Sequence, residues 1–95
     1  MSTYIISHIA NPDGTDKTDT MHTKRIGRRC SFISAPMIGH SLMAQCIGGG
    51  DGYTGTMRTS HVQNIAAVLG GVDVRTEDSI YHFRYAEGQI GLFLC

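Results

Sequence analysis

The sequence lacks several features that would assign it to a well-defined class of protein. Its 95 residues include eight Lys or Arg and eight Asp or Glu, so it has no net charge. A balanced charge removes the electrostatic signature of a protein dedicated to duplex nucleic acid. No apolar run approaches the roughly 18 residues that a membrane helix needs, and the first residues lack the basic start and apolar stretch of a secretion signal. We therefore expect one domain, residues 1–95, located in the cytoplasm with no membrane partner.

Cysteine, proline and strong helix formers are also sparse. The three cysteines, Cys30, Cys46 and Cys95, are widely spaced, and no Cys-x-x-Cys pair occurs. A structural zinc site needs closely spaced ligands, so we expect no metal, no cofactor and reduced thiols. The 12 glycines and the many threonines favour strands and turns over helices.

Apolar and polar residues alternate in several short segments, as they do in half-buried strands. These segments span residues 3–9, 26–33, 41–47, 53–60 and 89–95. Polar residues 15–23 are predicted to form an exposed loop. Residues 61–69 are ambiguous, because Val62, Ile65, Ala66 and Leu69 have helical spacing, and both a short helix and a continued strand remain open.

The clearest local pattern is a hairpin within residues 71–85, with its turn at Glu77 and Asp78. We expect Asp78 to tolerate a left-handed conformation in this turn. Side chains alternate along a strand, so one register puts a single set of residues on the core face. This set pairs Val72 with Phe83, Val74 with Tyr81 and Thr76 with Ser79, and it leaves Asp73 opposite His82 on the other face.

The pattern as a whole predicts a mainly β fold. We expect a small antiparallel barrel or sandwich of about six or seven short strands, with one short helix possible near residues 61–69. The apolar end, residues 92–95, would be an adhesive edge if it were unpaired. It would therefore close the barrel or pair with a second copy, and we expect a homodimer.

Two segments resemble a pattern in small uncharacterised bacterial and phage proteins. Residues 59–65 (TSHVQNI) match a strand of that pattern, and residues 74–83 (VRTEDSIYHF) match the hairpin that follows it. The resemblance implies a small Src-homology-3-like barrel, and it suggests an origin on a mobile element. It implies no activity.

The basic residues are clustered, since half of them fall between residues 24 and 29. Beside an exposed tyrosine, such a strand edge could hold single-stranded nucleic acid or a phosphate ligand. The alternative is that the cluster pairs with the aspartates of residues 13–19. The candidate binding residues are Lys24, Arg25, Arg28, Arg29 and Tyr53.

Two weaker patterns suggest chemistry. Residues 50–55 read Gly-x-Gly-x-x-Gly, which binds dinucleotides when a helix follows, but a hairpin loop is the expected reading. His8, His61 and His82 could converge with Asp73, and a carboxylate beside an imidazole can prepare a base. His82 and Asp73 are therefore the candidate catalytic pair.

We expect a non-catalytic interaction module that binds a protein partner or a small ligand, since no nucleophile and base stand out. One alternative is a nucleic-acid-binding barrel that uses residues 24–29. A second is a small enzyme with a His/Asp site at a dimer interface.

Overall fold

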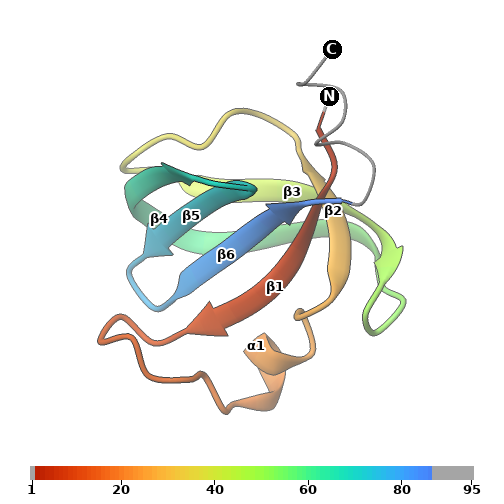
Figure 1. Ribbon diagram of the computed structural model, residues 1–95, viewed down its shortest axis with the longest axis horizontal. Helices are drawn as coiled ribbons and strands as arrows, with labels where there is room; N and C mark the ends of the chain where they lie inside the picture. The colour runs from red at the N-terminus through yellow and green to blue at the C-terminus, as the bar shows by residue number, and fades with distance from the viewer. Residues whose placement is uncertain (1, 87–95) are drawn as a thin grey trace.

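Six antiparallel strands close into a barrel in the computed structural model of the protein, which describes residues 2–86 (Figure 1). Each strand pairs with the next in sequence, and the last returns to the first. The prediction of a small antiparallel barrel is confirmed. The elements are β1 (Tyr4–Ala10), α1 (Thr20–Thr23), β2 (Arg28–Phe32), β3 (Ser41–Gly49), β4 (Thr54–Val68), β5 (Gly71–Thr76) and β6 (Ile80–Tyr85).

The barrel closes through β1 and β6. Their antiparallel ladder runs from the pair Tyr4 and Tyr85 to the pair Ala10 and Ile80. The described strands therefore close the barrel by themselves. The predicted strand at residues 89–95 lies outside the described residues, and so does Cys95. The homodimer stays a prediction.

The β5–β6 hairpin has the predicted register. Val72 pairs with Phe83, Val74 with Tyr81 and Asp73 with His82. The expectation of a left-handed Asp78 is wrong, because no described residue other than glycine has a positive φ. The Thr76 hydroxyl closes the turn instead, since its Oγ1 accepts hydrogen bonds from the backbone N–H groups of Asp78 and Ser79.

Residues 61–68 belong to β4 and Leu69 lies in the turn that follows, so the helical option is wrong. A β-bulge explains the misleading spacing. Val62 pairs with Thr76, but Asn64 pairs with Arg75, so β4 carries one extra residue at this point. The extra residue shifts the two-residue alternation by one. Val62 and Ile65 therefore both pack on the core, although they are three residues apart.

A similar bulge between Ile6 and His8 lets Ile6 and Ile9 both be fully buried. Bulges also bend strands, which helps a small sheet to close on itself. Cys30 and Cys46 are free and buried, and burial raises the pKa of the Cys30 thiol to about 12. The buried core comprises Ile6, Ile9, Cys30, Leu42, Ala44, Cys46, Met57, Val62, Val74, Tyr81 and Phe83.

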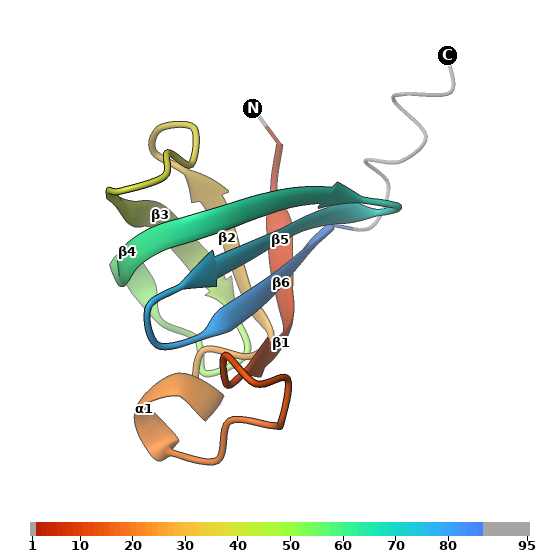
Figure 2. The same cartoon turned by 90° about the vertical axis from the view of Figure 1, so that its left-hand side faces the viewer.

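The predicted loop of residues 15–23 contains one unpredicted turn of helix, α1. Asp19 precedes this turn, and its carboxylate accepts a hydrogen bond from the backbone N–H of His22. Aspartate is a favoured N-cap because it satisfies a donor at the start of the helix. In Figure 2, α1 lies beyond the lower end of the barrel, away from the N-terminus.

Candidate functional site

A pocket of about 360 Å³ opens beside α1, between the start of β2 and the first half of β4. The β3–β4 loop forms another part of its wall. Met21, Tyr53, Thr56 and Met57 contribute its neutral lining. Its charged lining consists of Lys24, Arg25, Arg28, Asp51 and Arg58.

The charge of this pocket is unbalanced. Four of the eight basic residues line it, whereas Asp51 is the one acidic residue among residues 2–86 that does. The chain as a whole has no net charge. Positive charge is therefore concentrated at one place on a neutral protein, and the net charge of the sequence gives no sign of it.

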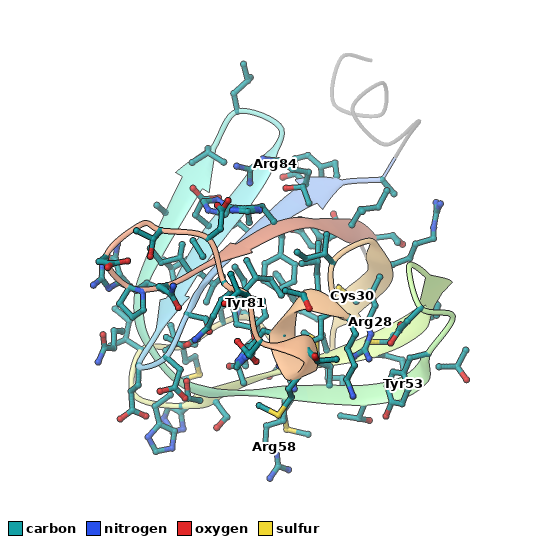
Figure 3. All side chains as sticks on the ribbon, turned by 90° about the horizontal axis from the view of Figure 1, so that it is seen from below. Arg28, Cys30, Tyr53, Arg58, Tyr81 and Arg84 are labelled. Atoms are coloured by element: carbon teal, nitrogen blue, oxygen red, sulfur yellow. The ribbon has the colours of Figure 1, made fainter. Side chains whose placement is uncertain are left out.

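Arg28 and Asp51 form one fixed wall of the pocket. Arg28 Nε donates to Asp51 Oδ1 at 2.9 Å, and Nη2 donates to Oδ2 at 2.8 Å. The guanidinium also lies 4.5 Å from the centre of the Tyr53 ring. Arg28 is 5% exposed, so this bidentate pair compensates a charge at a core-facing position. The hydrogen bonds from Arg28 lower the pKa of Asp51 to about 2, and the pair is fully ionised at neutral pH. Figure 3 shows Arg28 near Tyr53.

Glycines bring Asp51 to Arg28. Gly50 has a φ of 48°, and a Cβ at this position would meet Ile26 O at 2.8 Å and Arg28 N at 2.9 Å. Only glycine lets the loop lie this close to the start of β2. Residues 50–55 lead directly into β4 rather than into a helix. The hairpin reading is therefore confirmed, and the dinucleotide reading of this motif is wrong.

Arg25 is a second pocket cation that another side chain holds in place. Its Nη1 donates to Tyr81 Oη at 2.7 Å, and Tyr81 is only 1% exposed. Arg25 Nε is buried and has no hydrogen-bond acceptor among the described residues. A buried charged donor without an acceptor is costly, so this atom marks an incomplete interaction.

Lys24, Arg25 and Arg58 have no carboxylate partner within the described part of the chain. Lys24 and Arg58 are exposed, whereas Arg25 is half-buried. Figure 3 shows the Arg58 side chain projecting from the barrel. Three positive side chains thus face one pocket without compensation.

Four of the five predicted binding residues meet in this pocket: Lys24, Arg25, Arg28 and Tyr53. Arg29 does not line it, because the alternation along β2 turns its side chain outward, where its Cγ lies over Gly49. The expected pairing of the basic cluster with residues 13–19 is wrong. The aspartates of that segment contact Thr15, His8 and His22 instead.

Asp51 and Arg58 line the candidate site, and neither is predicted from the sequence. Asp51 lies in the glycine loop, and a carboxylate there gives no sign of which basic residue it meets. Arg58 sits between two buried residues, Met57 and Thr59, so alternation predicts only that it points outward. Its closeness to residues 24 and 25 is a product of barrel closure, which no local pattern contains.

The candidate pair His82 and Asp73 does meet, on the outer face of β5 and β6. His82 Nδ1 donates to Asp73 Oδ1 at 2.9 Å, and Arg84 Nη1 donates to the same oxygen at 2.8 Å. Burial raises the pKa of Asp73, but the bonds from Arg84 and His82 outweigh it, and the net pKa is lowered. Asp73 therefore stays ionised near neutral pH and joins His82 to Arg84 in a hydrogen-bonded ion-pair network on this outer face.

The predicted convergence of histidines is only partly correct. The His8 ring stacks on His82 at 5.8 Å between ring centres. His61 lies elsewhere, 3.8 Å from Glu77. Among the described residues no group of three or more His, Cys, Asp or Glu side chains could hold a metal ion.

Within residues 2–86 no helix has the length and apolar character to cross a membrane. Comparisons of the chain with protein-family models, with curated protein sequences and with solved structures found no significant match. The resemblance to small Src-homology-3-like barrels therefore stays a prediction.

Proposed function

We propose that this protein is a non-catalytic binding module that holds an anionic ligand in the basic pocket. The observation that carries the proposal is the surplus of cations. Lys24, Arg25 and Arg58 share the pocket without a carboxylate partner among the described residues. Gathered like charges repel each other and destabilise the folded state. A bound anion would remove that repulsion and supply the missing acceptors.

The dimensions and chemistry of the pocket support a small ligand. Its volume of about 360 Å³ is within the range of about 300–1,000 Å³ typical of small-molecule sites. Tyr53, Met21 and Met57 add apolar and aromatic surface beside the charges. A ligand with an anionic group and a small apolar body would satisfy both parts.

A binding role suits this pocket better than a catalytic one. Its one carboxylate, Asp51, is held by Arg28 at a pKa of about 2, which is far too low for a general base near neutral pH. Among the described residues that line the pocket there is no histidine and no cysteine. The hydroxyl of Thr56 consequently has no base beside it within the lining.

Single-stranded nucleic acid has weaker support as the ligand. Such sites need a basic track and aromatic side chains on which successive bases can stack. Tyr53 is the one aromatic side chain that residues 2–86 contribute to the lining, and Arg28 already lies over its ring. Arg29, which would extend the basic track, faces the outside of β2.

An NMR titration tests the proposal. ¹⁵N-labelled protein at low ionic strength would be titrated in turn with sulfate, citrate and phosphate. We expect at least one of these anions to shift the backbone amides of residues 21–25 and 56–58 saturably. In Arg58→Ala the affinity should fall about fivefold or more, because a charge-assisted bond is lost.

Arg75→Ala is the matched control for this titration, because Arg75 is another exposed strand arginine but lies outside the pocket. Its affinity should equal that of the wild type. Two results would refute the proposal: amide shifts that do not saturate with any of the three anions, or an equal loss of affinity in both variants.

A further inference from the structure

We infer that the anionic group in this pocket is a terminal phosphate, a phosphomonoester dianion, rather than a carboxylate or a phosphodiester. This inference rests on the proposed function and specifies the chemistry of its ligand. It follows from what the pocket already contains, from the donors that remain, and from the size of the space. Each of these points is independent of the others.

The Arg28–Asp51 pair shows how many cationic donors one carboxylate can satisfy in this pocket. The Asp51 carboxylate binds the Nε–Nη2 edge of Arg28 with both oxygens, and it also accepts the backbone N–H of Tyr53 at 3.2 Å. One carboxylate is thus largely used by one arginine. A second carboxylate would leave two of the three remaining cations without a partner.

The remaining donors suit a group with three acceptor oxygens. Lys24 and Arg25 follow α1, whereas Arg58 comes from β4, so the cations are supplied by different walls. A phosphomonoester has about −1.5 to −2 charges at pH 7 and three strong acceptor oxygens. A carboxylate has one charge and two oxygens in one plane, and a phosphodiester has one charge.

Arg25 is fixed in a manner that leaves its bidentate edge unused. Tyr81 Oη holds Nη1, and Nε has no acceptor among the described residues. Nε and Nη2 form the same edge that Arg28 presents to Asp51. A phosphate oxygen near this edge would complete the buried donor, and Tyr81 orients the guanidinium for it.

The space favours the end of a molecule over the middle of a chain. About 360 Å³ accommodates a phosphate with a small body, but a run of nucleotides needs an extended groove. Asp51 and the Tyr53 ring form a fixed wall beside it. A terminal phosphate could enter with the rest of its molecule directed toward solvent.

Calorimetric titration at pH 7.5 would compare three ligands that share one ring: phenyl phosphate, methyl phenyl phosphate and benzoate. We expect phenyl phosphate to bind about tenfold or more tightly than the other two, because it alone combines a second charge with three terminal oxygens. Arg58→Ala should lose most of this preference, while Arg75→Ala should keep it. Circular dichroism melting would verify that both variants are folded.

A second set of titrations would identify the source of the phosphate. Inorganic phosphate, thymidine 5′-monophosphate and a short oligothymidylate with and without a 5′-phosphate would be titrated. The inference predicts binding only where a terminal phosphate is present. Binding by the mononucleotide well above that of inorganic phosphate would indicate a nucleotide-like ligand, and equal binding would indicate a free oxyanion.

The failures of the two proposals differ. If benzoate binds as tightly as phenyl phosphate and Arg58→Ala weakens both, the terminal-phosphate inference is wrong and the anion-binding function stands. If the 5′-hydroxyl oligonucleotide binds as tightly as its phosphorylated form, the site reads a nucleic-acid backbone and the inference is again wrong. If no ligand binds, or Arg75→Ala is as damaging as Arg58→Ala, both proposals fail.

Discussion

The two ends of the barrel contrast in how their side chains are satisfied. At the end near the N-terminus, the Tyr4 ring stacks on Phe32 at 4.7 Å and on Tyr85 at 5.3 Å, and Phe32 meets the edge of Phe83 at 5.0 Å. At the other end, cations outnumber carboxylates around a pocket. The aromatic rings pack against one another, whereas Lys24, Arg25 and Arg58 have no carboxylate partner among the described residues.

Tyr81 connects the two ends. Its ring stacks on Phe83 at 5.9 Å, and its hydroxyl oxygen accepts a hydrogen bond from Arg25. The stacked rings of Phe83 and Tyr81 thus lead through the barrel to the guanidinium of Arg25. Under the proposed function, stability resides mainly in the aromatic end and ligand binding in the cationic end, and substitutions can separate the two.

The largest effect should come from Phe83→Ala. Phe83 is fully buried and contacts three other rings, so its truncation leaves a cavity in the core. We expect a loss of about 3–5 kcal/mol in the free energy of unfolding, measured by urea denaturation. Ile38→Ala, at an exposed loop position, is the control. A loss below about 1 kcal/mol for Phe83→Ala would contradict the assignment of stability to this end.

Tyr81→Phe should have an intermediate effect on both stability and ligand affinity. It keeps the stacked ring but removes the acceptor of Arg25 Nη1. We expect a loss of about 1 kcal/mol in unfolding free energy and a weaker affinity for phenyl phosphate. An unchanged affinity would mean that Tyr81 does not position Arg25.

Arg58→Ala should hardly change stability although it impairs binding. An exposed surface side chain usually contributes less than about 0.5 kcal/mol. Because removing one of several like charges relieves repulsion, the variant should melt at the same temperature as the wild type or slightly higher at low salt. A clear decrease in melting temperature would show that Arg58 has a structural partner and is not available to a ligand.

The smallest effect on stability should come from the Arg28–Asp51 ion pair, and it should depend on pH in the acid range. The folded-state pKa of Asp51, about 2, is below the usual aspartate pKa of 3.8. The Arg28–Asp51 pair therefore stabilises the fold fully above about pH 4, and its contribution is lost as the pH falls toward 2. The difference in unfolding free energy between the wild type and Asp51→Asn should narrow over this interval. Parallel curves from pH 6 to pH 2.5 would contradict the role of the pair.

Much of the fold could be predicted from the sequence, because strand alternation and turn chemistry are local. The β5–β6 hairpin was predicted to the residue pair, since its two faces differ sharply in polarity. Residues 61–69 were ambiguous, because a bulge gives a strand the three-residue spacing of a helix. Predicting that bulge would require knowing that Asn64 pairs with Arg75, a contact between strands.

The candidate site was predictable only in part. The cluster from Lys24 to Arg28 is contiguous, and its charge is visible in the sequence. Arg58 and Asp51 reach the same pocket only because β3 folds back beside β2 and the β3–β4 loop and β4 then curve round the barrel. Arg29 was wrongly included, because a charge cluster does not reveal which members a strand turns away.

The central claim is that the unpaired cations of the pocket bind an anionic ligand. NMR of the arginine side-chain Nε–Hε resonances tests this claim most directly. On titration with phenyl phosphate, the Arg25 resonance should shift saturably as its Nε gains an acceptor. The Arg28 resonance, already bonded to Asp51, should move little, and that of Arg84 should not move. An Arg25 resonance that stays unchanged at saturating ligand, or that moves no more than that of Arg84, would contradict the claim.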